Sequence, residues 1–195
     1  MIVKNLNKDE ITKIYKEHMV NDFPADELKP LSIILKGMDK QLFECLGFLD
    51  KESGQLKAYA VFIKNGNNYL FDYLAVVDGN RNDGIGSAFL KQIAEHFKNA
   101  DSVIGEVEDP DFAEDESERR LRERRIAFYE RNGYFNTGVK AKLFGVDFWI
   151  LEMNLGKKHT KDEIKTLYKS VYKKVLPFFR YLRCVKVKNT QLLRY

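Results

Sequence analysis

The stretch Arg81-Asn82-Asp83-Gly84-Ile85-Gly86-Ser87 joins an apolar, strand-like segment that ends at Val77 to an amphipathic segment that runs to Phe97. Glycine adopts the backbone conformations of a tight turn at little cost and lets the backbone approach a ligand closely. The first N–H groups of a helix, together with the helix dipole, favour a bound phosphate. The sequence therefore predicts a strand, a glycine turn and a helix that bind a cofactor with a phosphate-bearing tail.

Two common phosphate-binding motifs do not fit this turn. A Walker loop that starts at Gly79 needs Lys and Ser or Thr after Gly84, whereas Ile85 and Gly86 stand there. A dinucleotide fingerprint that starts at Gly84 needs a small sixth residue, where the chain has Phe89. Nucleotide hydrolysis and hydride transfer are therefore disfavoured.

A second block downstream makes the pattern more specific. Arg81-x-x-Gly84-x-Gly86 resembles motif A of the Gcn5-related N-acetyltransferase (GNAT) superfamily, which binds the pyrophosphate of CoA. The run from Ile126 to Tyr134, IAFYERNGY, resembles the motif B of that family, a helix that ends in Tyr-x-x-x-Gly-Phe/Tyr. Two blocks in the right order outweigh a single glycine turn. The chain is thus similar to GNAT enzymes over approximately residues 1–154.

The resemblance implies an α/β fold with a mixed sheet of about seven strands flanked by helices. Hydrophobic periodicity and turn residues place strands at 1–6, 43–49, 56–64, a segment ending at 77, 103–107, 141–144 and 146–153. They place helices at 7–20, within 26–37, at 85–97 and over motif B. In the family the strand of motif A and the next strand splay apart, and the resemblance implies that the pantetheine arm lies between them.

The resemblance also implies the reaction, which is transfer of acetyl from acetyl-CoA to an amine by direct attack in a ternary complex. An alkylammonium with a pKa of about 10.4 must lose a proton before it attacks a thioester. Asp72 aligns, by its spacing from Arg81, with the base of polyamine acetyltransferases of this superfamily. Glu106 on the next strand is the alternative base. A purely structural carboxylate at Asp72 is an equally open interpretation.

Two further roles follow from the resemblance. A backbone N–H at the end of the motif A strand, from Val76 or Val77, stabilises the charge on the thioester oxygen. Tyr129 of motif B protonates the departing CoA thiolate. Acetyl-CoA is therefore the expected cosubstrate, and the residues expected to bind it are Leu74, Ala75, Val76, Val77, Arg81, Asn82, Asp83, Gly84, Ile85, Gly86, Ser87 and Arg122.

Charge changes sharply around motif B. Residues 106–118 contain eight acids, and residues 119–125 contain five arginines. A helix tied by pairs such as Asp115 with Arg119 and Glu118 with Arg122 explains this pattern most simply. An acidic entrance that attracts a cationic acceptor is the alternative. Arg122 also departs from the family, which often has asparagine there, and Asp83 puts a carboxylate in the phosphate-binding turn.

Residues 156–195 form a basic extension after the GNAT domain, which we assign to residues 1–155. The extension has twelve Lys and Arg against two Asp and Glu. Thr160 with Glu163 predicts a capping box that opens a helix, and Pro177 interrupts it. The predicted helix has one apolar face, formed by Ile164, Leu167, Val171 and Val175. We expect this face to dock on the body of the protein or on a partner, with a homodimer left open, rather than on nucleic acid or an anionic membrane.

Composition restricts the remaining classes. At 195 residues and 44% hydrophobic content, the chain can bury one substantial core. It shows no apolar run typical of a signal peptide or a membrane span, so a cytoplasmic protein without membrane insertion is expected. Cysteine and histidine lack metal-ligand spacing, and no metal is expected. The acceptor is a small-molecule or protein amine; the alternative function is a catalytically impaired CoA sensor or a partner-binding protein with a basic tail.

Overall fold

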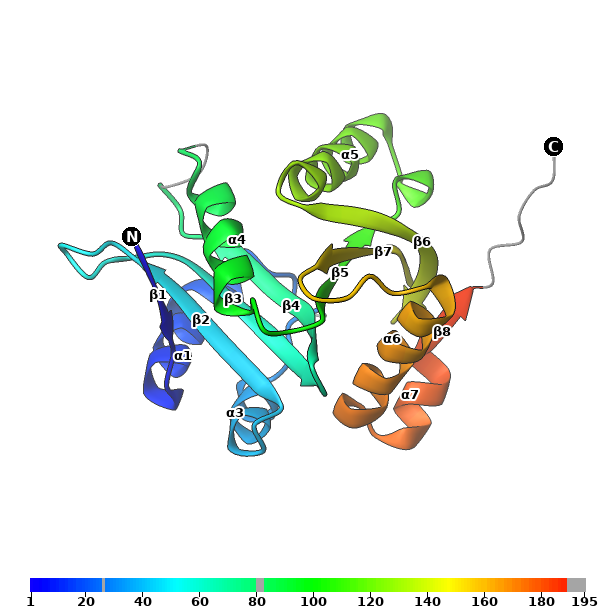
Figure 1. Cartoon of the computed structure of the whole chain (residues 1–195), viewed down its shortest axis with the longest axis horizontal. Helices are drawn as coiled ribbons and strands as arrows, with labels where there is room; N and C mark the ends of the chain where they lie inside the picture. Colours follow the sequence, from blue (N-terminus) through cyan, green and yellow to red (C-terminus); the bar gives the residue numbers. More distant parts are fainter. Residues whose placement is uncertain (26, 80–82, 189–195) are drawn as a thin grey trace. The chain divides into compact units, whose positions relative to one another are not determined.

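The computed structural model describes residues 1–25, 27–79 and 83–188 (Figure 1). Arg81 and Asn82 of the predicted turn lie outside the described residues. The chain forms two compact units, one of residues 1–64 and 71–98, the other of residues 65–70 and 99–195. Its strands follow the order β1-β2-β3-β4-β5-β7-β6-β8 in a single sheet. The described chain thus has a mixed sheet of eight strands, where about seven were expected.

The first unit contains the motif A segment. Its elements, in chain order, are β1 (Ile2–Asn5), α1 (Lys8–Ile14), η1 (Tyr15–Met19), α2 (Val20–Asp22), α3 (Leu31–Asp39), β2 (Phe43–Leu49), β3 (Leu56–Asn65), β4 (Asn68–Val76) and α4 (Ile85–His96). The capping box at Asn7 and Glu10 is confirmed. The single helix expected over 7–20 is divided by the π-helical turn η1. The helix expected within 26–37 begins only at Leu31 and extends to Asp39; Pro30, its N-cap, has φ −52° and ψ 138°, outside the helical region.

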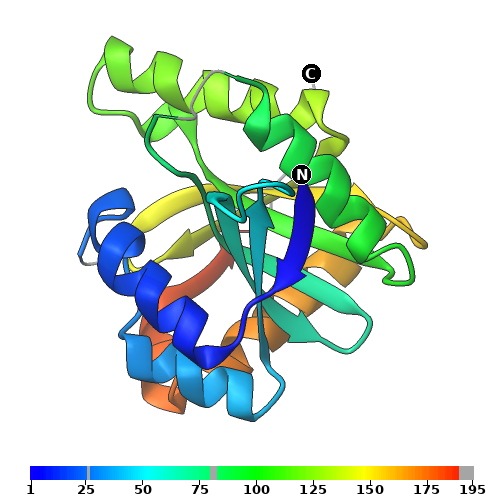
Figure 2. The ribbon, with the colours of Figure 1, turned by 90° about the vertical axis from the view of Figure 1, so that its left-hand side faces the viewer.

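Helices cover both faces of the strands in the first unit (Figure 2). Phe48 of β2 stacks on Phe89 of α4, with ring centroids 5.0 Å apart. Phe43 points to the opposite face, since it lies an odd number of residues away. There it packs against α3 so closely that a Cβ added to Gly37 would lie 1.8 Å from its ring. Helix α4 is therefore fixed on one face by a buried aromatic contact, and α3 on the other by a glycine.

The second unit contains motif B and the extension. Its elements are β5 (Ser102–Glu108), η2 (Pro110–Phe112), α5 (Glu116–Arg131), β6 (Tyr134–Leu143), β7 (Val146–Asn154), α6 (Lys161–Val175), α7 (Phe178–Cys184) and β8 (Val185–Lys188). Strands β5, β7, β6 and β8 pair antiparallel in that order. Helix α5 lies on one side of β5, β7 and β6, and α6 lies on the other (Figure 1).

Strands β6 and β8 differ from the expectation. Strand β6 begins at Tyr134 rather than at residue 141. The missed part contains Asn136 and Gly138, both typical of turns, and the register shifts between Asn136 and Val139. Strand β8 pairs with β6 from within the basic extension, which was expected to be helical. Among the described residues, no helix is long and apolar enough to cross a membrane.

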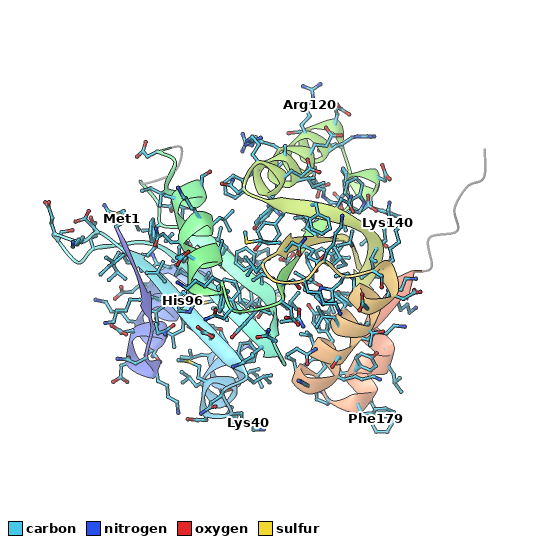
Figure 3. The ribbon with its side chains drawn as sticks, viewed as in Figure 1. Met1, Lys40, His96, Arg120, Lys140 and Phe179 are labelled. Carbon is cyan, nitrogen blue, oxygen red and sulfur yellow. The ribbon has the colours of Figure 1, made fainter. Side chains whose placement is uncertain are left out.

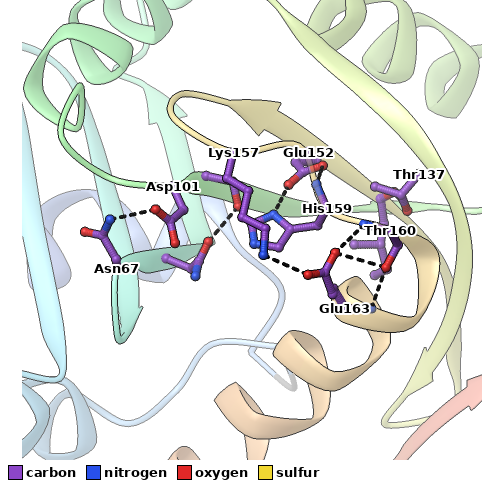
Figure 4. A network of polar contacts seen from close by, with 11 residues as sticks. Asn67, Asp101, Thr137, Glu152, Lys157, His159, Thr160 and Glu163 are labelled. Carbon is purple, nitrogen blue, oxygen red and sulfur yellow. Dashed lines mark hydrogen bonds and ion pairs between the residues drawn. The ribbon is translucent and has the colours of Figure 1, made fainter.

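The extension is anchored where α6 begins (Figure 4). The predicted capping box at Thr160 and Glu163 is confirmed. His159 Nδ1 lies 2.6 Å from Oε1 of Glu152, a fully buried carboxylate of β7. The apolar face of α6 is buried, with Ile164 and Val171 completely covered. The expectation that the extension docks on the body is met within this unit.

The capping box makes stability depend on pH. Hydrogen bonds from the Lys157 ammonium and the Thr160 backbone lower the pKa of Glu163 from 4.5 to about 2. A depressed carboxyl pKa adds stability above the ordinary value, and this contribution is lost as pH falls toward the folded value. Glu163→Gln is therefore expected to be less stable than the wild type at neutral pH, by a margin that shrinks between pH 4.5 and about 2. Urea unfolding at several pH values measures this difference.

A matched control is Glu123→Gln, which removes one partner of the exposed Arg119–Glu123 pair on α5. Exposed pairs contribute little, so the control should differ little from the wild type. A stability difference between Glu163→Gln and the wild type that stays constant as the pH falls would contradict the role assigned to the Glu163 charge.

Candidate active site

The glycine turn lies in the first unit, between β4 and α4. Gly84 is the N-cap of α4 and has φ +73°, a left-handed conformation that favours glycine. Among the described residues, no side chain caps the helix there. The N–H groups at the start of a helix have no intrahelical carbonyl partner, so those of Ile85, Gly86 and Ser87 can bind an anion. Asp83 is exposed beside them, and the predicted strand residues Leu74–Val77 are half-buried.

Gly84→Ala tests this turn. The left-handed backbone costs a residue with a Cβ about 1 kcal/mol, which we expect as lost unfolding free energy. Relaxation of the turn would tilt the amides and weaken CoA binding about tenfold, equivalent to about 1.4 kcal/mol. Calorimetric titration with CoA measures the second effect. Gly66→Ala, at φ +65° in the β3–β4 hairpin, carries the same strain as a control; equal CoA affinity in the two variants would rule out the turn as the phosphate site.

The two valines expected to stabilise the thioester oxygen differ in their backbone contacts. The N–H of Val77 donates to the carbonyl of Lys57 at 2.9 Å, toward β3. Successive N–H groups of an antiparallel strand alternate between its two edges. The N–H of Val76 therefore points away from β3. Of the two candidates, Val76 has the better orientation for an oxyanion donor.

Asp72, the first candidate base, is held in an ion pair. Its side chain is 4% exposed, and Oδ1 accepts from Lys29 Nζ at 2.6 Å. Oδ2 is buried without a hydrogen-bond partner among the described residues. Tyr73 fixes the segment that carries the lysine, because its hydroxyl donates to the Glu27 carbonyl and accepts from the Lys29 N–H. Lys29 thus pairs with the carboxylate that was suggested as the base by its spacing from Arg81.

Glu106, the second candidate base, lies on β5 in the second unit and is half-buried. Tyr172 donates its hydroxyl hydrogen to Oε2 at 2.8 Å, and Tyr168 donates to Oε1. Both tyrosines belong to α6 of the extension. Two hydroxyls from one helix therefore hold this carboxylate at both of its oxygens.

Tyr129 lies in the last turns of α5 and is half-buried. Its ring meets that of Tyr134 edge to face, with centroids 5.4 Å apart. Burial raises the pKa of the Tyr129 phenol to about 12, although the nearby Arg125 charge opposes this shift. The phenol therefore keeps its proton at neutral pH, as a proton donor must.

Arginines and acids of α5 form a paired surface. Arg122 is buried and donates to the Asp109 carbonyl at 2.8 Å and to Glu118 at 2.7 Å. Exposed Arg120, which projects from α5 in Figure 3, pairs with Glu116. The predicted pair of Glu118 with Arg122 is confirmed. Arg119, however, pairs with Glu123, because Asp115 serves as the N-cap and accepts from the Glu118 N–H.

Further pairs in this region favour the structural interpretation of the acidic stretch. Glu108 lies 2.7 Å from Arg125, and Asp109 lies 2.7 Å from Lys140. Arg122 also forms a longer ion pair with Glu108, at 3.5 Å. Arg122, expected to contact the cofactor, is thus engaged by its own unit, and its cofactor role stays a prediction.

The predicted residues fall into two groups. The first unit holds Asp72, Leu74–Val77 and Asp83–Ser87, and the second holds Glu106, Arg122 and Tyr129. Lys29, Tyr168 and Tyr172 were not predicted as site residues. Tyr168 and Tyr172 lie on the apolar face of α6, a position that predicts core residues. Nothing in the sequence relates them to Glu106. Within the described ranges, no cluster of three potential metal ligands occurs.

Comparison with known proteins relates this geometry to solved structures. The sequence matches no protein-family model and no curated protein. A Bacteroides thetaiotaomicron structure assigned to the GNAT family of acetyltransferases has a TM-score of 0.71 and 18% identity, over 90% of this chain and 98% of that chain. A spermidine N-acetyltransferase chimera from Vibrio cholerae and hSSAT has a TM-score of 0.60 and 11% identity, over 85% and 99%.

A third structure was solved with a cofactor. It is an aminoglycoside 6'-N-acetyltransferase complexed with coenzyme A, with a TM-score of 0.58 and 14% identity, over 82% of this chain and 99% of that chain. All three matches extend over nearly the whole of the other chain. This chain therefore has the fold of the GNAT acetyltransferases.

Proposed function

We propose that the protein transfers an acetyl group from acetyl-CoA to an amine by direct attack within a ternary complex. The observation that carries this proposal is Gly84, whose left-handed backbone caps the start of α4, the helix that follows β4 along a chain with the GNAT fold. The turn would hold the pyrophosphate of CoA on the N–H groups of residues 85–87. The tail would thereby direct the thioester toward the end of β4.

The proposed chemistry needs a base, and we assign Glu106. A base that accepts a proton from an ammonium must present an ionised carboxylate to it. Asp72 already neutralises Lys29 at 2.6 Å, so its use would leave a lysine that is 17% exposed without this partner. Glu106 is held by the hydroxyls of Tyr168 and Tyr172, and we assign the acceptor's proton to it. Asp72 then serves as a structural carboxylate.

The proton balance of the step is as follows. The acceptor ammonium gives one proton to Glu106, directly or through water, and Glu106 passes it to solvent. The nitrogen lone pair forms the C–N bond, and the backbone N–H of Val76 stabilises the oxyanion. The C–S bond then breaks, and Tyr129 gives its proton to the CoA thiolate. The second nitrogen proton restores Tyr129 through water, so the products are an amide, CoA thiol and one released proton.

Measurement of CoA thiol release tests the proposed function. The acceptors to compare are spermidine, an aminoglycoside, free amino acids and a peptide with an amino-terminal amine, since solved neighbours include a spermidine and an aminoglycoside N-acetyltransferase. Amine-dependent release supports the proposal. CoA binding without release by any acceptor would reject it in favour of a CoA sensor, an alternative supported by the pairing of Asp72 with Lys29 and of Arg122 with Glu118.

A further inference from the structure

The basic extension reaches the candidate base. Tyr172 donates to Glu106 Oε2 at 2.8 Å, and Tyr168 donates to Oε1 of the same carboxylate. The two tyrosines lie 62 and 66 residues after Glu106 in the sequence. All three residues belong to the second unit, so the contact is internal to one compact body. A segment beyond the GNAT-like part thus contributes two hydroxyls that hold this carboxylate.

The two tyrosines are built into the core rather than placed on the surface. Tyr168 is 0% exposed and Tyr172 is 1% exposed. Positions four residues apart lie on one face of a helix, and their ring centroids are 5.0 Å apart. A buried tyrosine hydroxyl ordinarily requires a hydrogen-bond partner. Here a single carboxylate serves both hydroxyls, so its position is fixed at two points.

Tyr168 is well supported as a donor. Burial, followed by the charge of Glu106, raises the pKa of the Tyr168 phenol well above its ordinary value. The phenol therefore stays protonated at neutral pH. The helix that carries it is anchored at its start by the Thr160–Glu163 capping box and the buried His159–Glu152 contact (Figure 4). A rigid helix keeps the two donors in place.

We propose that Tyr168 and Tyr172 are positioning residues for Glu106, and that the extension is in this way part of the catalytic apparatus. This inference rests on the proposed function, in which Glu106 accepts the acceptor proton. Hydrogen bonds from hydroxyls to a carboxylate are charge-assisted and favour its ionised form. They fix the plane of the carboxylate and keep it ready to accept a proton as the pH falls.

The test compares Tyr168→Phe, Tyr172→Phe and the double variant with wild type. Each phenylalanine keeps the ring and removes one donor to the carboxylate. The double variant is expected to lower kcat about tenfold, less than the hundredfold or more typical of losing a general base itself, with little change in the KM for acetyl-CoA. The acidic limb of kcat/KM should move to higher pH, because loss of the donors disfavours the ionised carboxylate. Each single variant should show a smaller shift in the same direction.

Tyr181→Phe is the matched control. Tyr181 is a buried tyrosine of α7 in the same extension, and in the described part of the chain no hydrogen bond joins its hydroxyl to Glu106. It should keep the wild-type kcat and pH profile, and thermal unfolding of every variant separates lost stability from lost catalysis. If the double variant does not fold, the kcat values and pH profiles of the two single variants decide whether the tyrosines position Glu106.

The outcomes separate this inference from the proposed function. A wild-type chain that turns over, together with Tyr variants that retain its kcat and pH profile, overturns the positioning role alone. Variants that lose activity only in proportion to their lost stability, with an unmoved acidic limb, also overturn it. A wild-type chain that releases no CoA with any acceptor overturns the proposed function and this role with it.

Discussion

Replacement of Glu106 with glutamine is expected to lower kcat about a hundredfold, because general acid–base catalysis by one side chain typically contributes that much or more. Glutamine keeps the shape of the side chain but cannot accept a proton from an ammonium. The KM for acetyl-CoA should change little, since the glycine turn that would bind the cofactor belongs to other elements. Initial rates of CoA release at saturating acceptor, measured across pH, give both constants.

Asp72→Asn is the matched comparison, because it makes the same change in the other candidate carboxylate. It removes the charge that pairs with Lys29 at 2.6 Å, and we expect it to lower the unfolding free energy more than it lowers kcat. The reverse order, with a large loss of kcat in Asp72→Asn and near-normal turnover in Glu106→Gln, would assign the base to Asp72.

Tyr129→Phe is expected to lower kcat by about a hundredfold as well, since it removes the proposed proton donor for the CoA thiolate. The phenyl ring keeps the edge-to-face contact with Tyr134, so the fold should persist. The phenol must be protonated to act, and its pKa is about 12. Its contribution is therefore present at neutral pH and is lost only as the pH rises toward that value.

Tyr134→Phe is the control for this variant. Tyr134 lies beside Tyr129, and its buried hydroxyl has no hydrogen-bond partner in the described part of the chain. Removal of that hydroxyl should leave kcat near the wild-type value. Equal kcat values in Tyr129→Phe and wild type, measured by release of CoA thiol, would show that the thiolate leaves without this donor.

The sequence predicts the local features of this protein well. Capping boxes at Asn7 and Thr160 depend on side chains three residues from their partners, and both are present. The glycine turn and the motif B helix are likewise read from neighbouring residues, and they lie where the pattern places them. Segments with mixed signals are less predictable: β6 starts seven residues before the expected strand, across Asn136 and Gly138.

The contacts that distinguish the two candidate bases could not be predicted. Lys29 meets Asp72 across 43 residues, and Tyr168 meets Glu106 across 62 residues. Such pairs arise only when the sheet and helices pack, and no local pattern encodes them. From sequence, tyrosines on an apolar helix face are predicted to be core residues, and Tyr168 and Tyr172 do lie in the core. Each also donates its hydroxyl to the Glu106 carboxylate, as a buried tyrosine usually requires.

The most direct measurement of the central claim follows the acetyl group itself. Acetyl-CoA labelled in its acetyl carbon is incubated with the wild-type chain and the acceptor that gives the fastest CoA release, and labelled products are quantified by NMR alongside free CoA thiol. The proposed reaction predicts one labelled amide on the acceptor for each CoA thiol formed. Acetyl transfer by this protein would be contradicted if the label were recovered as acetate. It would also be contradicted if the label stayed on bound CoA in the presence of every amine.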